Sequence, residues 1–382
     1  MLLKTIMAAL AATSLLLSGS VLAGSKVVLT SMLQGGVLDA SSYLEEGQIA
    51  NEGVAMFKPV LHPSGEYVYG FGMGGVGKID LNSYQVSLVF DRSVYSGYRE
   101  LLVHPNGELL YIVGDFGIDV VDTIAYNTVA TIEMPGIKQA AISRDGGQLY
   151  INQTAGPQRF IKLNSMTLAV EEEVNFSGKN TISYTFENGM PLDSSGNYAV
   201  VYAEGSTIRG INTSTYELLP VINTSSEVSQ LLLVGDAIYM NDQSNIIKVY
   251  GIADGVLRAT IDVGYEVVGG MAYDEEHQIV HVAGFEPSEG SVSSIDVNSY
   301  LIINTGVAYS QVTGMVIKPS AVDLALQIQR MTPFVVQCSN DTTGQVVTFA
   351  PKEGETVYNC EANGLIVAAG DQVTVAARGN AQ

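Results

Sequence analysis

Short runs of apolar and aromatic residues alternate along most of the chain with clusters of Gly, Pro, Asn, Asp and Ser. Runs such as Tyr67-Val68-Tyr69-Gly70-Phe71 and Leu109-Leu110-Tyr111-Ile112-Val113 are rich in β-branched and aromatic side chains, as buried strands are. The polar clusters have the composition of tight turns. The pattern therefore predicts an all-β protein built from many short antiparallel strands.

One polar cluster, which we call the first turn motif, recurs along the chain. It reads His62-Pro63-Ser64-Gly65, then His104-Pro105-Asn106-Gly107, then Ser143-Arg144-Asp145-Gly146. Pro presets φ for a type I turn and Gly lets the chain leave with positive φ, so each copy is expected to join two strands. Weaker copies near residues 196, 235, 276 and 320 make seven units at intervals of 39 to 50 residues. The longest interval indicates an insertion around Glu171 to Asn188.

A second turn motif follows the first by about 19 residues. Ile79-Asp80-Leu81-Asn82-Ser83-Tyr84 and Ile295-Asp296-Val297-Asn298-Ser299-Tyr300 differ at one position, and degenerate copies occur at Asp122 and Asn164. We expect Asp80, Asp122 and Asp296 to cap a turn through side chain to backbone hydrogen bonds. Four strands and two marked turns per unit describe one blade of a β-propeller.

The two motifs together resemble the YVTN-type β-propeller repeat, whose strand motif here reads Tyr111-Ile112-Val113-Gly114. The resemblance covers about residues 24–330 and implies a closed, usually seven-bladed propeller. Because the family's functions are diverse, it implies fold much more than chemistry. We expect Lys26 to Leu33 to add the strand that locks the last blade to the first. Six or eight blades are alternatives, and a pair of β-sandwiches is the competing architecture, which the regular period disfavours.

Both ends of the chain depart from the repeat. Lys4, the apolar run Ile6 to Leu17 and Val21-Leu22-Ala23 predict a secretory signal peptide over residues 1–23, rather than a membrane anchor, because polar residues interrupt the run. The mature protein is therefore expected in the periplasm or outside the cell. Residues 331–382 predict a small C-terminal β-module in which Cys338 and Cys360, the only cysteines, form a disulfide.

Composition narrows the class of partner. Acidic residues outnumber basic ones 39 to 18, for a net charge of −21, while 47% of the 382 residues are hydrophobic. A disordered chain would lack this apolar content, and a nucleic-acid binder would not have this charge. No segment after the leader is long and apolar enough to span a bilayer. We expect a folded monomer that binds no nucleic acid.

The histidines do not suggest a catalytic set. His62, His104 and His277 occupy copies of the first turn motif in different blades, so a structural role is expected. His281 lies in a predicted strand and is expected to be a partly buried, hydrogen-bonded side chain. No Gly-x-Ser-x-Gly elbow accompanies them. We therefore predict no catalytic residue.

Metal and phosphate motifs are also weak. There is no His-Glu-x-x-His and no complete calcium loop. The runs Glu171-Glu172-Glu173 and Asp274-Glu275-Glu276 could hold calcium only weakly, and solvated charge on a loop is the ordinary explanation. Gly72 to Gly77 is interpreted as a hairpin turn, because no helix follows it. The prediction is no metal ligand and no cofactor, with weak calcium binding as the alternative.

The predicted binding residues are Tyr95, Tyr98, Arg99 and Glu100. They place two aromatic and two charged side chains just before an inner strand, where propellers usually bind ligands. The leading hypothesis is a non-enzymatic, exported binding or scaffold propeller that engages a protein or glycan at the cell envelope. The alternative, by fold analogy, is a lactonase-like or quinoprotein-like enzyme acting at the channel mouth. A third reading makes the C-terminal module a sorting or attachment device.

Overall fold

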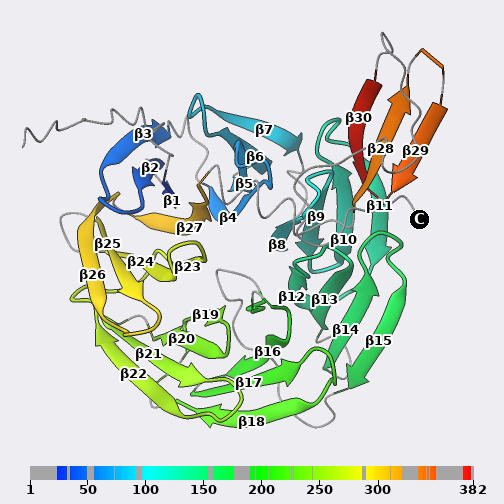
Figure 1. Ribbon diagram of the computed structural model, residues 1–382. Helices are drawn as coiled ribbons and strands as arrows, with labels where there is room; N and C mark the ends of the chain where they lie inside the picture. Colours follow the sequence, from blue (N-terminus) through cyan, green and yellow to red (C-terminus); the bar gives the residue numbers. More distant parts are fainter. Residues whose placement is uncertain are drawn as a thin grey trace, which may run out of the picture.

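The computed structural model describes residues 24–31, 35–49, 56–72, 74–91, 97–153, 158–175, 190–193, 195–204, 206–224, 226, 228–242, 244–285, 290–309, 311–320, 334–340, 342–343, 345–349 and 373–379. Seven antiparallel sheets surround a central axis as the blades of a propeller (Figure 1). The predicted all-β, seven-bladed fold is confirmed, and the alternatives of six blades, eight blades and two sandwiches are wrong. Within the described residues there is no helix, and so none that could cross a membrane.

We name the blades A to G in ring order and give their strands from the axis outwards. Blade A contains β27 (Val312–Lys318), β1 (Lys26–Ser31), β2 (Gly35–Asp39) and β3 (Glu45–Ile49). Blade B contains β4 (Phe57–Leu61), β5 (Tyr67–Gly72), β6 (Gly75–Asp80) and β7 (Val86–Asp91). Blade C contains β8 (Tyr98–Val103), β9 (Leu109–Gly114), β10 (Gly117–Asp122) and β11 (Thr128–Glu133). Blade D contains β12 (Ile137–Ile142), β13 (Gln148–Gln153), β14 (Arg159–Asn164) and β15 (Val170–Asn175).

Blade E contains β16 (Tyr198–Glu204), β17 (Thr207–Asn212) and β18 (Leu218–Asn223), with an isolated bridge between Leu192 and Ala199 at its inner edge. Blade F contains β19 (Gln230–Val234), β20 (Ala237–Asn241), β21 (Ile246–Gly251) and β22 (Leu257–Asp262). Blade G contains β23 (Met271–Asp274), β24 (Ile279–Phe285), β25 (Gly290–Asp296) and β26 (Ile302–Ala308).

The ring closes in blade A, where both ends of the propeller segment pair. β1 pairs with β27 in a register that sets Lys26 opposite Lys318. The predicted locking strand is therefore confirmed, but the N-terminal segment supplies three strands, not one. The sequence signal for the other two is a copy of the second turn motif, Leu38-Asp39-Ala40-Ser41-Ser42-Tyr43, which the repeat analysis missed.

The first turn motif joins the innermost strand of a blade to its second strand, as predicted. His62 Nδ1 lies 2.8 Å from Ser64 Oγ, and His62 Nε2 lies 2.9 Å from the carbonyl oxygen of Gly107 in the next blade. His104 Nε2 makes the same kind of contact, 3.1 Å from the carbonyl oxygen of Gly146. These two imidazoles therefore connect the turns of successive blades, the structural role that their repetition predicts.

The second turn motif closes each blade between its third and outermost strands. Asp80 Oδ1 accepts hydrogen bonds from the backbone N–H of Asn82 and Ser83, each at 2.9 Å, and the N–H of Tyr84 donates to the Asp80 carbonyl at 2.7 Å. This α-turn leaves its fifth residue with positive φ. In all seven blades φ at that position lies between 53° and 69°, at Tyr43, Tyr84, Tyr126, Leu168, Tyr216, Gly255 and Tyr300. The predicted capping by Asp80, Asp122 and Asp296 is confirmed.

The left-handed conformation directs the turn tyrosine toward the preceding blade. A Cβ atom at Gly47 in β3 would lie 2.1 Å from ring atom Cε2 of Tyr84, and one at Gly306 in β26 would lie 2.7 Å from Cβ of Tyr43. Left-handed geometry costs a residue with a side chain roughly 1–2 kcal/mol. Packing between blades offsets this cost, because the ring lies directly on a neighbouring strand that has no side chain there.

The hydrophobic core is divided among the blade interfaces. The described residues form seven buried clusters, each shared by two adjacent blades. In the interface of blades D and E, for example, the rings of Tyr150 and Phe160 stack with centroids 5.6 Å apart. Each blade therefore buries its faces against its neighbours.

The acidic run Glu171-Glu172-Glu173 was predicted to lie in a loop at the start of an insertion, and this prediction is wrong. All three residues belong to β15, the outermost strand of blade D. Arg159 and Lys162 of β14 face this strand, with Nη1 of Arg159 3.1 Å from Glu173 and Nζ of Lys162 3.4 Å from Glu171. An outermost strand is exposed to solvent, so a run of charge is compatible with strand pairing there. The rest of the predicted insertion, residues 176–188, lies outside the described residues.

The C-terminal strands form a separate three-stranded sheet. β28 (Phe334–Asn340) is central, between β29 (Gln345–Phe349) and β30 (Val373–Gly379), and the sheet lies outside the ring of blades (Figure 1). Cys338 lies in β28, but Cys360 lies outside the described residues, so the disulfide stays a prediction. Residues 1–23 also lie outside them, and the leader and the limits 24–330 and 331–382 likewise stay predictions.

We expect Gly47→Ala to destabilise the propeller by about 1–3 kcal/mol, because the new methyl group would displace the Tyr84 ring from the interface of blades A and B. Urea unfolding measures the change. Gly74→Ala is the matched control, since its nearest neighbour would be Cδ2 of Leu88 at 3.9 Å. Equal stability of the two variants would show that the ring contact does not stabilise the interface.

Candidate functional site

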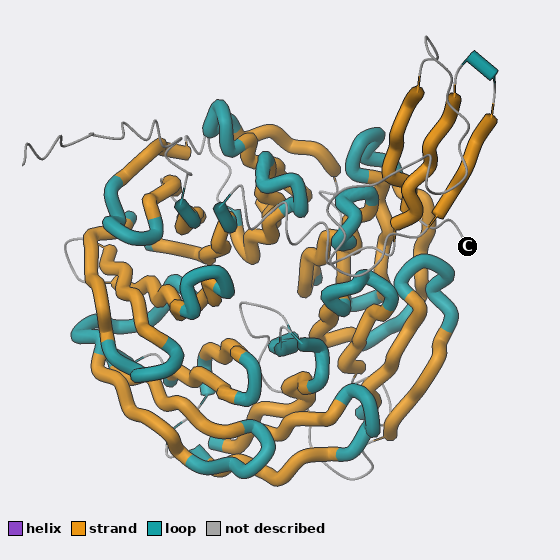
Figure 2. The backbone as a smooth tube through the Cα atoms, viewed as in Figure 1, coloured by secondary structure: helices purple, strands orange, loops and turns teal. Residues whose placement is uncertain are grey.

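The two axial faces of the propeller differ in the origin of their loops. The first and second turn motifs both lie at one end of the strands, which we call the repeat face. The other end, the irregular face, contains the connections between second and third strands and those between blades (Figure 2). The turns of the repeat face are fixed by the seven-fold pattern. Binding residues are commonly placed on loops that a rigid scaffold positions, so the irregular face is the place to search.

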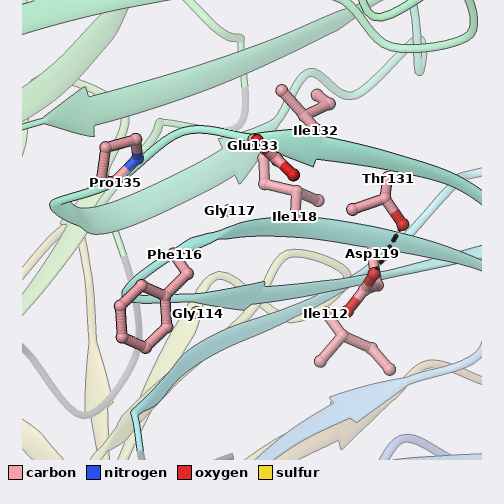
Figure 3. A pocket seen from close by; sticks show the side chains of 10 residues that line it. All are labelled: Ile112, Gly114, Phe116, Gly117, Ile118, Asp119, Thr131, Ile132, Glu133 and Pro135. Atoms are coloured by element: carbon pink, nitrogen blue, oxygen red, sulfur yellow. Dashed lines mark hydrogen bonds between the residues drawn. The ribbon is translucent and has the colours of Figure 1, made fainter.

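A cleft of about 410 Å³ opens at the irregular face of blade C. Its lining comes from β9, β10, β11 and the connections beyond them (Figure 3). The residues are Ile112, Gly114, Phe116, Gly117, Ile118, Asp119, Thr131, Ile132, Glu133 and Pro135. Gly114 pairs directly with Gly117 across β9 and β10. A Cβ at Gly114 would have room, whereas one at Gly117 would lie 1.9 Å from the Ile132 carbonyl oxygen, so Gly114 leaves space in the cleft and Gly117 permits the close approach of β11.

The lining combines an aromatic ring with hydrogen-bond acceptors. Phe116, in the turn between the two glycines, is 66% exposed. Deeper in the cleft Thr131 donates a hydrogen bond of 2.8 Å to Asp119 Oδ1 (Figure 3). Glu133 is exposed and adds a second carboxylate, while none of the described lining residues is Lys or Arg. This set suits a ligand that has apolar C–H faces and hydroxyl or ammonium donors.

The predicted binding residues lie beside this cleft. Tyr95 lies outside the described residues, and Tyr98 is described only by its backbone, which pairs with Gly114 of the cleft. Arg99 Nε donates a 2.7 Å hydrogen bond to Asp115 Oδ1, and Asp115 directly precedes Phe116. Arg99 therefore holds the turn that presents Phe116. The structure brings the Tyr98 backbone and the Arg99 side chain to the edge of the cleft, and Arg99 is not in its lining.

Glu100 is isolated from the cleft and from Arg99. It is 5% exposed, and its Oε2 lies 3.7 Å from Lys58 Nζ of blade B, with no hydrogen-bond partner for that oxygen among the described residues. Burial raises the pKa of Glu100 to about 8, although the Lys58 charge opposes the shift. At neutral pH the carboxyl group is therefore largely protonated. Glu100, which the sequence indicates as one of a charged pair, is instead a buried acid.

Lys58 and Arg99 occupy equivalent positions in adjacent blades. The register shifts between Phe57 and Val60 in β4 and between Tyr98 and Glu100 in β8, so each basic residue lies at a bulge of an innermost strand. Lys58 has φ of 51° and donates a 2.6 Å hydrogen bond from Nζ to the Arg99 carbonyl. Both cations are thus used in contacts within the protein.

A second group of polar side chains meets at the interface of blades G and A. His281 is fully buried, more than the sequence predicted, and its Nδ1 lies 2.8 Å from the Tyr43 hydroxyl. That hydroxyl lies 2.5 Å from Ser294 Oγ. Asp274 Oδ2 lies 2.9 Å from His277 Nδ1 and 3.9 Å from His281 Nε2. Unlike His62 and His104, His277 and His281 share one carboxylate.

Electrostatics keep Asp274 ionised. Burial alone raises its pKa, but the imidazole of His281 facing it, the hydrogen bond with His277 and the charge of His277 lower it to below the ordinary 3.8. The sequence signal was the spacing of Asp274, His277 and His281 around one turn. Because His277 lies in a copy of the repeated first turn motif, the sequence alone predicts a structural role for it and does not relate it to Asp274 and His281.

Replacing Glu100 with Gln should make the stability of the protein less dependent on pH. Between pH 4.5 and about 8 the unfolded chain has released this proton while the folded protein still holds it. The free energy of unfolding therefore falls as pH rises through that interval. We expect the wild-type protein to lose on the order of 2 kcal/mol more than E100Q between pH 5 and pH 8.5, measured by urea unfolding. E133Q, an exposed control, should keep the wild-type dependence, and an unchanged slope in E100Q would contradict the assignment.

Comparisons with known proteins show the fold and no family. No protein-family model matches the chain, and no curated protein does. A solved structure of the dihydro-heme d1 dehydrogenase NirN in complex with DHE is similar, with 12% identity, a TM-score of 0.56, and coverage of 80% of this chain and 76% of that one. A functionally unknown protein from Desulfotomaculum acetoxidans DSM 771 is similar at 14% identity, with a TM-score of 0.57 and coverage of 77% and 98%. These likenesses support the propeller fold, while the YVTN-type repeat remains a resemblance.

Proposed function

We propose that this protein is a non-enzymatic, exported binding propeller that holds a glycan of the cell envelope in the cleft of blade C. The observation that supports this most is the lining of the cleft, in which the exposed Phe116 ring stands beside the acceptors Asp119 and Glu133. Aromatic rings pack against the C–H faces of sugars, and carboxylates accept hydrogen bonds from their hydroxyl groups.

The size of the cleft favours a glycan over a protein partner. At about 410 Å³ it lies in the range of about 300–1,000 Å³ that is typical of small-ligand sites. A stable protein interface buries roughly 800 Å² on each partner and has a larger apolar centre. A segment of one or two sugar units is the occupant that the cleft supports best.

The charge of the protein restricts the class of sugar. With a net charge of −21 and two carboxylates in the cleft, an acidic glycan would be repelled. Neutral sugars and sugars with free amino groups are compatible with these acceptors. The predicted leader would bring the protein to the compartment where such glycans occur.

A second candidate function, an enzyme acting at the channel, is favoured by Glu100. A buried carboxyl group with a pKa of about 8 is suited to act as a general acid or base near neutral pH. The similar protein NirN is a dihydro-heme d1 dehydrogenase, but at 12% identity the likeness supports only the fold. The test is a panel of lactones and quinones offered to the wild-type protein and to E100Q. If the wild-type protein turns over one of them and E100Q does not, the protein is an enzyme and the binding proposal is wrong.

We expect short neutral and amino sugars to bind with one-site stoichiometry in isothermal titration calorimetry, with chitotriose, a chitosan trimer and maltotriose as probes. Phe116→Ala should weaken binding about tenfold, because it removes the stacking surface. Gly114→Val should abolish it. A Cβ at Gly114 meets only backbone oxygens, of Gly97 at 3.5 Å and Gly117 at 3.9 Å, so the side chain has room to fill the cleft.

Ile124→Ala is the matched control, because Ile124 is an apolar residue that is 86% exposed on the repeat face of the same blade. It should bind each probe as the wild-type protein does. If all three probes bind equally to wild type, F116A and G114V, or bind to none, the glycan site of blade C is wrong. Capture of a protein partner that is lost in F116A would indicate that the cleft recognises protein.

A further inference from the structure

The turn between β23 and β24 of blade G gathers three metal-binding side chains. One ligand atom each from Asp274, Glu276 and His277 lie within 4.8 Å of one another. Asp274 is 2% exposed at its side chain and His277 45% exposed, so the group extends from the protein interior to solvent. A cation could therefore reach the group from outside while one ligand stays fixed by the core.

A second observation points to a ligand at this turn. His281 lies behind Asp274, is fully buried, and its Nε2 has no hydrogen-bond partner among the described residues. Its Nδ1 is held by the Tyr43 hydroxyl at 2.8 Å, so Nε2 is left facing Asp274 Oδ2 at 3.9 Å, too far for a hydrogen bond. A buried nitrogen without a partner requires an explanation, and an ion is one of the common ones.

We propose that Asp274, Glu276 and His277 bind a divalent transition-metal cation of the Zn²⁺ class. Carboxylate oxygens alone suit Ca²⁺ or Mg²⁺, whereas an imidazole ligand shifts the preference toward Zn²⁺ and its neighbours. Three protein ligands with water in the remaining position are a normal Zn²⁺ set. The calcium that the acidic run alone suggested is therefore the poorer fit.

The arrangement also explains the buried imidazole. In the structure His277 Nδ1 is hydrogen-bonded to Asp274 Oδ2 at 2.9 Å. When His277 Nδ1 binds the metal, it releases its proton and gives up that hydrogen bond. Asp274 then needs another donor, because metal-bound carboxylates are usually hydrogen-bonded by a second group. His281 Nε2 is placed to supply it after a small rotation of the Asp274 carboxylate.

The site lies where the ring closes. Glu276 Oε1 accepts a 2.8 Å hydrogen bond from Ser320 Oγ, and Oε2 accepts hydrogen bonds from Ser25 Oγ at 3.1 Å and from the Ser320 backbone N–H at 3.2 Å. Ser25 precedes β1 and Ser320 follows β27, the two strands that close blade A. Metal binding would order the Glu276 carboxylate that joins both segments, so we expect the metal to stabilise the closed ring.

The test uses untagged, full-length protein freed of metal by chelation. Titration calorimetry with Zn²⁺ should give one site, and the melting temperature should rise with Zn²⁺ concentration, while Ca²⁺ and Mg²⁺ at the same concentrations leave it nearly unchanged. Co²⁺ should give a visible absorption band from bound metal. His277→Ala and Glu276→Gln should each lose at least about tenfold in Zn²⁺ affinity.

Glu275→Gln is the matched control, because it removes the same charge from the same turn, where Glu275 pairs with Arg144 at 2.9 Å. It should keep wild-type Zn²⁺ affinity and the Co²⁺ band. Circular dichroism of each variant checks that it is folded. Absence of Zn²⁺ binding, equal binding by H277A, E276Q and E275Q, or a stronger effect of Ca²⁺ than of Zn²⁺ would overturn the proposal.

Discussion

Contact between each blade and its neighbours is the constraint on which the rest of this structure depends. The buried clusters are shared by adjacent blades, so no blade can bury its faces alone. The α-turn of the second motif strengthens this coupling, because its positive φ directs a tyrosine such as Tyr84 onto a glycine of the blade before it. Pairing of β1 with β27 completes the circle and places β1 inside its sheet, between β27 and β2.

This constraint determines where a ligand cleft can form. On the repeat face, His62, Asp80 and their counterparts are committed to backbone contacts that define the turns. The side chains of the irregular face do not have to form these repeated turns. Phe116 can project there because its turn connects β9 and β10, and each of these strands is paired on both sides. In the cleft of blade C, Gly114 leaves room for a ligand, and Gly117 opposite it lets β11 approach closely.

The fold was predictable because its signals are local and repeated. Turn motifs such as Asp80 to Tyr84 determine their own hydrogen bonds, and their interval gave the blade number. The site was predictable only in part. The stretch from Tyr98 to Glu100 does lie beside the cleft, but the partners of Arg99 and Glu100 are Asp115 and Lys58, in another strand and another blade. Such contacts follow from blade packing, which spacing along the chain does not encode.

Ring closure also explains why polar side chains gather at the interface of blades G and A. This interface joins segments more than 200 residues apart, such as Tyr43 with His281 and Ser25 with Glu276. On the other side of blade A, Thr313 of β27 contacts Met56, next to β4 of blade B, across a similar separation. Hydrophobic packing alone is tolerant of small shifts in register, but the hydrogen bonds of the Tyr43 hydroxyl with His281 and Ser294 are directional and are not. The polar groups therefore add directional contacts between blade G and the N-terminal strands of blade A, which come from the other end of the propeller segment.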